Sequence, residues 1–210
     1  MSNKENDMSY TLSFDSSIDG DLIYSTPYTV DTFDYSFYEP VPPKLKCFKL
    51  FPQAHLPTYG SDWAACFDLK ASLRPGDAVK VYDITNNKTS VEVDMTQSFV
   101  LYSGQRALVP TGLIFDLESG QSLRIHPRSG LALKNGIIVA NCEGIVDADY
   151  VEQSYVMLHN ISDIAFEVKD GDRIAQGEVV NYTTYNIVEV DDRPAQKTNR
   201  DGGFGSTGTK

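Results

Sequence analysis

The feature that most constrains the fold is a succession of short segments with alternating apolar and polar residues, spread over residues 46–190. Val79 and Val81 show the period of two that is typical of strands buried on one face. Turn residues separate the segments, as at 86–87 and 118–120. Because helical periodicity is almost absent, we expect an all-β sandwich or barrel. The predicted strands are 47–51, 78–84, 90–95, 98–102, 113–117, 122–126, 155–159, 164–168 and 179–190.

Two shorter segments break this pattern. A single short helix is expected at 129–134, with Ser129 as its cap and Gly136 at its end. Residues 196–210 form a Gly-rich tail, which follows a core at 41–195. The tail carries one aromatic residue, Phe204, and its composition suits a mobile flap that orders on a ligand. A plain disordered terminus is the alternative.

Residues 1–40 differ from the rest of the chain in charge. They contain one lysine and eight acidic residues, which is most of the net charge of −11. A solvated, disordered extension is the favoured interpretation. The alternative is an arm that binds a protein partner or a sister subunit, because the segment also holds several aromatic residues. These are Tyr24, Tyr28, Phe33, Tyr35, Phe37 and Tyr38.

Composition excludes several classes of protein. An acidic chain is poorly suited to binding along a nucleic-acid backbone, so no direct nucleic-acid binding is expected. No apolar run reaches the roughly 18 residues that span a bilayer, and no secretory signal is evident, so we expect an intracellular, cytoplasmic protein. Cys47, Cys66 and Cys142 are far apart and predict buried thiols rather than disulfides or a zinc site.

The segment 126–132 has the residues of a phosphate cradle. The Arg128 guanidinium can bind two phosphate oxygens, Ser129 offers a hydroxyl, and Gly130 allows a close approach of the backbone. A helix that begins here would direct free N–H groups at an anion. An arginine at an ordinary surface turn is the alternative interpretation.

The segment 141–150 contains an acidic pair, Asp147 and Asp149. On a strand these two side chains would share one face. The further oxygen ligands and the sixth-position glycine of an EF-hand loop are absent, so a calcium loop is rejected.

Together and in this order, these segments resemble the five motifs of the trimeric dUTPase family, and the match covers roughly residues 45–210. The resemblance implies a distorted, jelly-roll-like β-barrel (the β-clip fold) and a homotrimer with sites at subunit interfaces. It also implies hydrolysis of dUTP to dUMP and pyrophosphate, which lowers dUTP and supplies dUMP for thymidylate synthesis. The matching segments are 65–69, 127–132, 141–150, 171–176 and 200–208.

The resemblance implies one catalytic residue and one cofactor. Asp147 would orient and deprotonate the water that attacks the α-phosphorus. Mg²⁺ would be held mainly by the triphosphate and by waters, with Asp68 acting through a metal-bound water. The residues implied for phosphate binding are Arg128, Ser129, Gly130 and Gln176.

The same resemblance assigns the base and the sugar. Asn141 and the backbone around Gly144 would pair with the uracil edge, and Tyr150 would crowd out a ribose 2′-hydroxyl. Phe204 would stack on uracil when the tail of another subunit closes, and Arg200 would bind the γ-phosphate. Gly205 and Ser206 complete the implied substrate-binding set.

The chain departs from the family pattern at several positions. Cys66 replaces the usual glycine of the first motif, and Glu152 replaces a glycine after the third. The fifth motif is one residue short between its arginine and Phe204, which weakens the assignment of Arg200. Residues 77–96 look inserted.

Two rival functions stay open. A dCTP deaminase shares this fold and needs a glutamate near the base, a role that Glu143 is placed to fill. A dUTPase with an added regulatory role, using residues 1–40 or the insertion to bind a partner, is the second.

Overall fold

The computed structural model describes residues 42–199. The described strands and the helix all belong to one unit, which begins at Pro43. In chain order they are β1 (Lys46–Lys49), β2 (Thr58–Tyr59), β3 (Phe67–Lys70), β4 (Ala78–Tyr82), β5 (Lys88–Glu92), β6 (Ser98–Leu101), β7 (Arg106–Pro110), β8 (Leu113–Asp116), β9 (Gln121–His126), α1 (Ser129–Asn135), β10 (Ile137–Val139), β11 (Gly144–Asp147), β12 (Tyr155–Asn160), β13 (Phe166–Lys169) and β14 (Arg173–Asn181).

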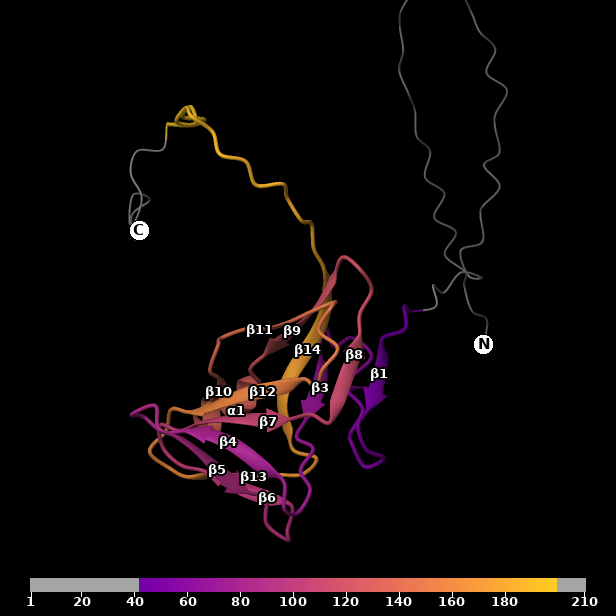
Figure 1. Cartoon of the computed structure of the whole chain (residues 1–210), viewed down its shortest axis with the longest axis vertical. Helices are drawn as coiled ribbons and strands as arrows, with labels where there is room; N and C mark the ends of the chain where they lie inside the picture. The colour runs from indigo at the N-terminus through magenta and orange to yellow at the C-terminus, as the bar shows by residue number, and fades with distance from the viewer. Residues whose placement is uncertain (1–41, 200–210) are drawn as a thin grey trace, which may run out of the picture. The chain divides into compact units, whose positions relative to one another are not determined.

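The strands form two five-stranded sheets and two strand pairs (Figure 1). One large sheet has the order β10-β12-β7-β4-β5 and the other β11-β9-β14-β3-β2. The pairs are β1-β8 and β13-β6. Each pairing between the described strands is antiparallel, and non-consecutive strands lie side by side, as in β14 between β9 and β3. The expected all-β class with one short helix is therefore confirmed.

Alternating side chains build the core between the sheets. Val79 and Val81 of β4 are at most 1 % exposed, while the residues between and beside them are exposed. Leu123 and Ile125 of β9 are buried in the same way from the other sheet. At Gly177 of β14 an added Cβ would lie 2.8 Å from the Phe67 ring, so only glycine fits there.

Most predicted strands are present with shifted ends, but several strands were not predicted. The missed strands are β2, β3, β7, β10 and β11. In β3, Phe67, Asp68 and Leu69 are all buried, so the alternation that reveals a strand is absent. The prediction for 164–168 was wrong in its start, because the Asn160 side chain donates to the Ile164 carbonyl and holds a turn there before β13.

The prediction for 179–190 was wrong in both ends. β14 begins at Arg173, and the chain leaves the sheet after Asn181. Residues 182–199 are exposed throughout and run away from the sheets as an extended arm, drawn in yellow in Figure 1. Residues 1–41 and 200–210, and with them Arg200, Phe204, Gly205 and Ser206, lie outside the described residues.

The helix is close to its predicted position, but its first cap differs. Arg128 is the N-cap residue, and no side chain caps the helix, so the predicted cap at Ser129 was wrong. Gly136 ends the helix as predicted, with a left-handed φ of 65° that favours glycine. Within residues 42–199, no helix has both the length and the apolar composition that crossing a membrane requires.

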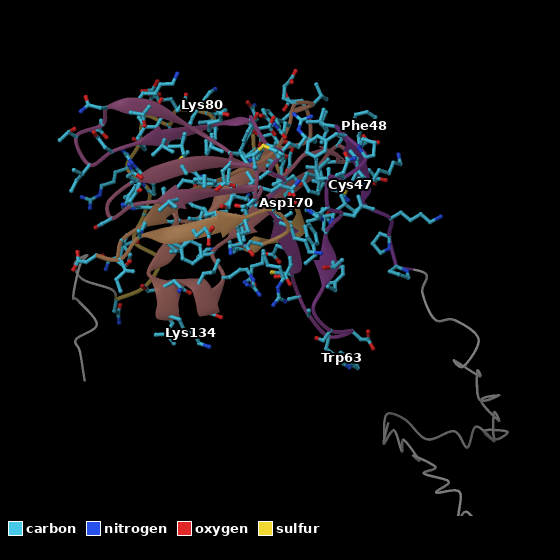
Figure 2. All side chains as sticks on the ribbon, turned by 90° about the horizontal axis from the view of Figure 1, so that it is seen from below. Cys47, Phe48, Trp63, Lys80, Lys134 and Asp170 are labelled. Carbon is cyan, nitrogen blue, oxygen red and sulfur yellow. The ribbon has the colours of Figure 1, made fainter. Side chains whose placement is uncertain are left out.

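The cysteines are less buried than predicted. Cys47 and Cys66 are half-buried and Cys142 is exposed. Figure 2 shows Cys47 beside Phe48 on β1, and it shows Trp63 at the tip of the loop between β2 and β3, far from the core. The expectation that all three thiols are buried therefore did not hold in this chain.

Candidate active site

A buried carboxylate gathers two arginines at one end of the β9 sheet. Asp68 of β3 is 8 % exposed, and its Oδ1 accepts a hydrogen bond from Nε of Arg128 at 2.9 Å. Its Oδ2 accepts from Nη1 of Arg173 at 3.2 Å. Ion-paired hydrogen bonds of this kind hold guanidinium groups in fixed orientations. The cluster of Asp68, Arg128 and Arg173, called here the arginine cluster, keeps one net positive charge at the edge of the site.

Strand register explains why these residues meet. Gln176 of β14 lies opposite Asp68 of β3 on one side and opposite His126 of β9 on the other. Arg128 follows His126 by two residues, and so it reaches the same end of the sheet. The structure therefore brings three predicted site residues together, because Asp68 lies opposite Gln176 in the sheet and binds the Arg128 side chain, which reaches it from just beyond the end of β9.

Arg173 belongs to this cluster although it was not predicted as a site residue. It is the first residue of β14, and the pairing with β3 shifts register between Arg173 and Ala175. The turn before it is fixed by Asp170, which accepts a hydrogen bond from Leu73 N at 2.8 Å and pairs with His55 Nε2 at 2.9 Å. The sequence offered one signal for Arg173, namely its position as a basic residue inside the fourth motif.

The residues after Arg128 face open space. Ser129 and Gly130 are exposed, and a Cβ added to Gly130 would meet no atom within 4 Å. Nothing in the described chain therefore requires a glycine at this position. A requirement for glycine here would have to come from a bound molecule.

The loop that joins β10 to β11 holds Asn141 and ends at Gly144, the first residue of β11. Gly144 is tightly packed, since an added Cβ would lie 3.1 Å from Ile125 Cβ and 3.6 Å from Asn141 Nδ2. Cys142 has a positive φ of 62°, which is uncommon for a residue other than glycine. The loop therefore has a sharp and closely packed shape, with the Asn141 amide directly beside Gly144.

Charged side chains connect this loop to the sheet. Glu143 forms an ion pair with Arg124 of β9 at 3.0 Å and lies 3.8 Å from His126 Nδ1. Nε2 of His126 in turn lies 3.1 Å from Glu178 of β14. Burial and the nearby Glu178 carboxylate raise the pKa of the Cys66 thiol, so Cys66 belongs to the same neighbourhood.

Asp147 is the last residue of β11, at the other end of the β9–β11 pair. Its side chain is exposed and makes no hydrogen bond or ion pair with the described residues. Asp149 lies in the following turn, so the expectation that both acids share one strand face was wrong. Asp147 and Asp149 line a shallow hollow together with Leu117, Ser119, Ala148 and Tyr182.

The two ends are well separated within one chain. Asp147 pairs with Ser122, whereas the arginine cluster lies beyond His126. Four residues of strand span about 13 Å at the usual rise per residue. A single copy therefore does not place Asp147 beside Arg128.

Tyr150 closes the segment that follows Asp147. Its backbone N donates to the Asp147 carbonyl at 3.1 Å, and its hydroxyl donates to the Gln153 carbonyl at 3.0 Å. Tyr150 as a residue is 40 % exposed. Asn141, Gly144, Asp147 and Tyr150 thus lie on one continuous segment, 141–150, which comprises the end of a loop, β11 and the turn after it.

The described residues offer little to a metal ion by themselves. Among them no group of three or more His, Cys, Asp or Glu side chains is placed to bind one. Asp68, within the arginine cluster, supplies one carboxylate. This donor set fits Mg²⁺ that arrives with phosphates, because Mg²⁺ keeps several waters and commonly uses one or two carboxylates.

Comparison with known proteins identifies the class of protein that this fold and this site define. The dUTPase family model matches residues 85–208. The deoxyuridine 5′-triphosphate nucleotidohydrolase of Caulobacter vibrioides is 39 % identical over 153 residues, which cover 73 % of this chain and 85 % of the relative. The chain belongs to the dUTPase family.

Solved structures agree with this fold. A mutant dUTPase of Staphylococcus bacteriophage 80alpha with dUpNHpp gives a TM-score of 0.61 at 16 % identity, over 80 % of this chain and 99 % of that one. A mutant dUTPase of phage phi11, described with a structural Mg(II) ion, gives 0.57 at 15 % identity, over 73 % and 100 %. At these identities the likeness concerns the fold alone.

Proposed function

We propose that this protein hydrolyses dUTP to dUMP and pyrophosphate. Water attacks the α-phosphorus, the bond from that phosphorus to the bridging oxygen breaks, and pyrophosphate leaves. Asp147 orients the water and accepts its proton. The observation that carries this role is the exposed Asp147 carboxylate without a partner among the described residues, at the end of β11 and three residues before Tyr150.

The arginine cluster is the proposed phosphate site. Arg128 and Arg173 are already oriented by Asp68, so they bind an anion with little loss of side-chain freedom. Ser129, Gly130 and Gln176 complete the set that we propose for the phosphates. A positioned base contributes about 10²–10⁴-fold in rate, so charge neutralisation at this cluster must supply much of the remaining acceleration.

Mg²⁺ is the proposed cofactor, and Asp68 is the residue that would hold it, through a metal-bound water. When bound, the ion would neutralise charge on the phosphates. Asp68 has a second role in the described structure, because its two oxygens hold the two arginines.

The segment 141–150 is the proposed nucleoside site. The Asn141 amide and the Gly144 backbone pair with the uracil edge, and the Tyr150 ring lies against the deoxyribose. A cytosine in this position would exchange donor for acceptor and leave buried groups unpaired, so dCTP is rejected. Phe204 stacks on uracil, Arg200 binds the γ-phosphate, and Gly205 with Ser206 completes the closed tail.

A complete site in this proposal needs more than one copy of the chain. Asp147 and Arg128 lie at opposite ends of β9, so residues from different subunits have to meet at an interface. We propose a homotrimer with three such sites. The exposed arm at 182–199 runs away from the sheets (Figure 1), and in this proposal it crosses to a neighbouring subunit.

The rival deaminase is disfavoured by the state of Glu143. Its carboxylate is engaged by Arg124 and lies close to His126, so it is not a free base at the nucleoside site. Binding of a protein partner by residues 1–40, a role for the segment 77–96, and a cytoplasmic location where dUTP is formed stay predictions.

A pyrophosphate-release assay across the deoxynucleoside triphosphates, with and without Mg²⁺, tests the proposal. We expect release from dUTP, stimulation by Mg²⁺, and little release from dCTP or dTTP. Ammonia release from dCTP would contradict the proposal and support the deaminase.

A further inference from the structure

We propose that Gln153 is a positioning residue for sugar specificity, which fixes the Tyr150 ring so that the site rejects ribonucleotides. The inference rests on the proposed function, in which Tyr150 lies against the deoxyribose. Gln153 itself lies beside that ring and does not touch the nucleotide.

Tyr150 is tied down at both ends. Its backbone N donates to the Asp147 carbonyl at 3.1 Å, and its hydroxyl donates to the Gln153 carbonyl at 3.0 Å. Tyr150 as a whole residue is 40 % exposed, so part of it is accessible to a ligand. The orientation of its ring therefore depends on where the Gln153 carbonyl lies.

The Gln153 side chain fixes that carbonyl by using both halves of its amide. Oε1 accepts a hydrogen bond from Gly112 N at 3.1 Å, and Nε2 donates to the Tyr155 hydroxyl at 2.6 Å. Only an amide supplies an acceptor and a donor at these two positions. Glutamate would lose the donor, and methionine would lose both hydrogen bonds at a similar size.

Gly112, whose N–H donates to the Gln153 side chain, has little room to move. Gly112 has a φ of 69°, and an added Cβ would lie 2.8 Å from Ala54 Cβ. Thr111 donates to the Ser154 carbonyl from its N at 3.2 Å and from Oγ1 at 2.6 Å. Ser154 N donates to Leu113 O at 2.8 Å. The segment around Gln153 is therefore joined on both sides to the start of β8.

Rigidity of the ring has a specific consequence for the substrate. The Tyr150 ring can exclude a ribose 2′-hydroxyl only if the ring does not move aside. Specificity is the difference in kcat/KM between dUTP and UTP. Loosening Tyr150 should therefore help UTP relative to dUTP. A residue with a merely structural role would lower the kcat/KM of both substrates in parallel.

The test compares kcat/KM for dUTP and for UTP in the full-length protein. In Gln153→Met we expect the dUTP-to-UTP ratio to fall by about tenfold, which is the upper range for lost hydrogen bonds. Gln105→Met is the matched control. Gln105 Oε1 also accepts a backbone hydrogen bond, from Tyr102 N at 2.9 Å, but it lies in the β6–β7 turn, and its loss should leave the ratio unchanged.

Tyr150→Phe supplies a second measurement if the first variant does not fold. It removes the hydroxyl and keeps the ring, so the ratio should fall in the same direction. A ratio equal to that of the wild type in both variants, or a parallel fall for both substrates, would overturn the role of Gln153. Failure of the wild-type protein to hydrolyse dUTP would instead refute the proposed function.

Discussion

The two ends of β9 differ in how far the chain itself completes them. At the His126 end, a buried carboxylate already holds two arginines. At the Ser122 end, Asp147 is exposed, lines a shallow hollow and contacts no charged partner within residues 42–199. One end is arranged before a ligand arrives, and the other is left open.

This difference follows from what each end has to do. Phosphate charge is best met by groups fixed in advance, because reorientation during the reaction costs energy. A base that acts on water must keep access to water and to the nucleotide, so its carboxylate cannot be consumed by an ion pair. The contrast predicts that substitutions at the two ends will fail in different ways.

The largest loss of activity is expected at the Ser122 end, where Asp147 is exposed. Asp147→Asn should reduce kcat by about 10²–10⁴-fold, because the amide cannot accept the proton of water. Binding of a non-hydrolysable dUTP analogue, measured by calorimetry, should stay within a few-fold of the wild type. Turnover close to normal in this variant would rule out Asp147 as the base.

At the His126 end, which holds the arginine cluster, substitution should mainly lower the free energy of unfolding. Asp68→Ala leaves two guanidiniums without their carboxylate and should lower the free energy of unfolding by about 2–3 kcal/mol, somewhat less than for a fully buried pair. Asp116→Ala is the matched control, because it breaks the exposed Lys46–Asp116 pair and should cost less than about 1 kcal/mol. Urea denaturation measures both, and equal losses would show that the arginine cluster adds no special stability.

A smaller effect is expected for Gly130, also at the His126 end, where a substitution should lower ligand affinity without lowering stability. Gly130→Ala should unfold at the wild-type temperature, because its Cβ would meet open space. Its affinity for the triphosphate analogue should fall by about tenfold if the backbone approaches a phosphate there. Gly60→Ala, which also points into open space, is the control. Unchanged affinity in Gly130→Ala would remove this residue from the phosphate site.

The smallest perturbation uses the natural cysteines. Burial raises the pKa of Cys47 to about 11, so its reactive thiolate is scarce at pH 8 and should increase about tenfold per pH unit up to pH 10. The exposed Cys142, in the proposed nucleoside segment 141–150, should react with iodoacetamide first, and a bound dUTP analogue should slow this reaction. Mass spectrometry of the labelled peptides follows each site, and labelling of Cys47 before Cys142 would contradict the described burial.

Sequence pattern predicted those parts of the fold that local chemistry determines. Alternation located strands such as β4 and β9, and Gly136 marked the end of the helix because its left-handed backbone favours glycine. Alternation could not find β3, which is buried on both faces around Asp68. Nor could it show that β14 ends at Asn181, since the segment beyond remains rich in apolar residues.

The candidate site was predictable to the extent that motifs name residues. Asp68, Arg128 and Gln176 were named and do lie together, since Asp68 is opposite Gln176 in the sheet and binds Arg128. Arg173 was missed because its role depends on a pairing with Asp68 across 105 residues, which no local pattern reveals. Gln153 was missed for a related reason, since its partner Gly112 lies 41 residues away.

The central claim is that one working site combines the two ends of β9 from different copies of the chain. Subunit mixing tests it most directly. Asp147→Asn and Arg128→Gln should each be nearly inactive on dUTP. Unfolded together and refolded into mixed assemblies, they should regain pyrophosphate release, because some interfaces then pair an intact Asp147 with an intact Arg128. Mixed assemblies that stay as inactive as either variant alone would contradict the claim.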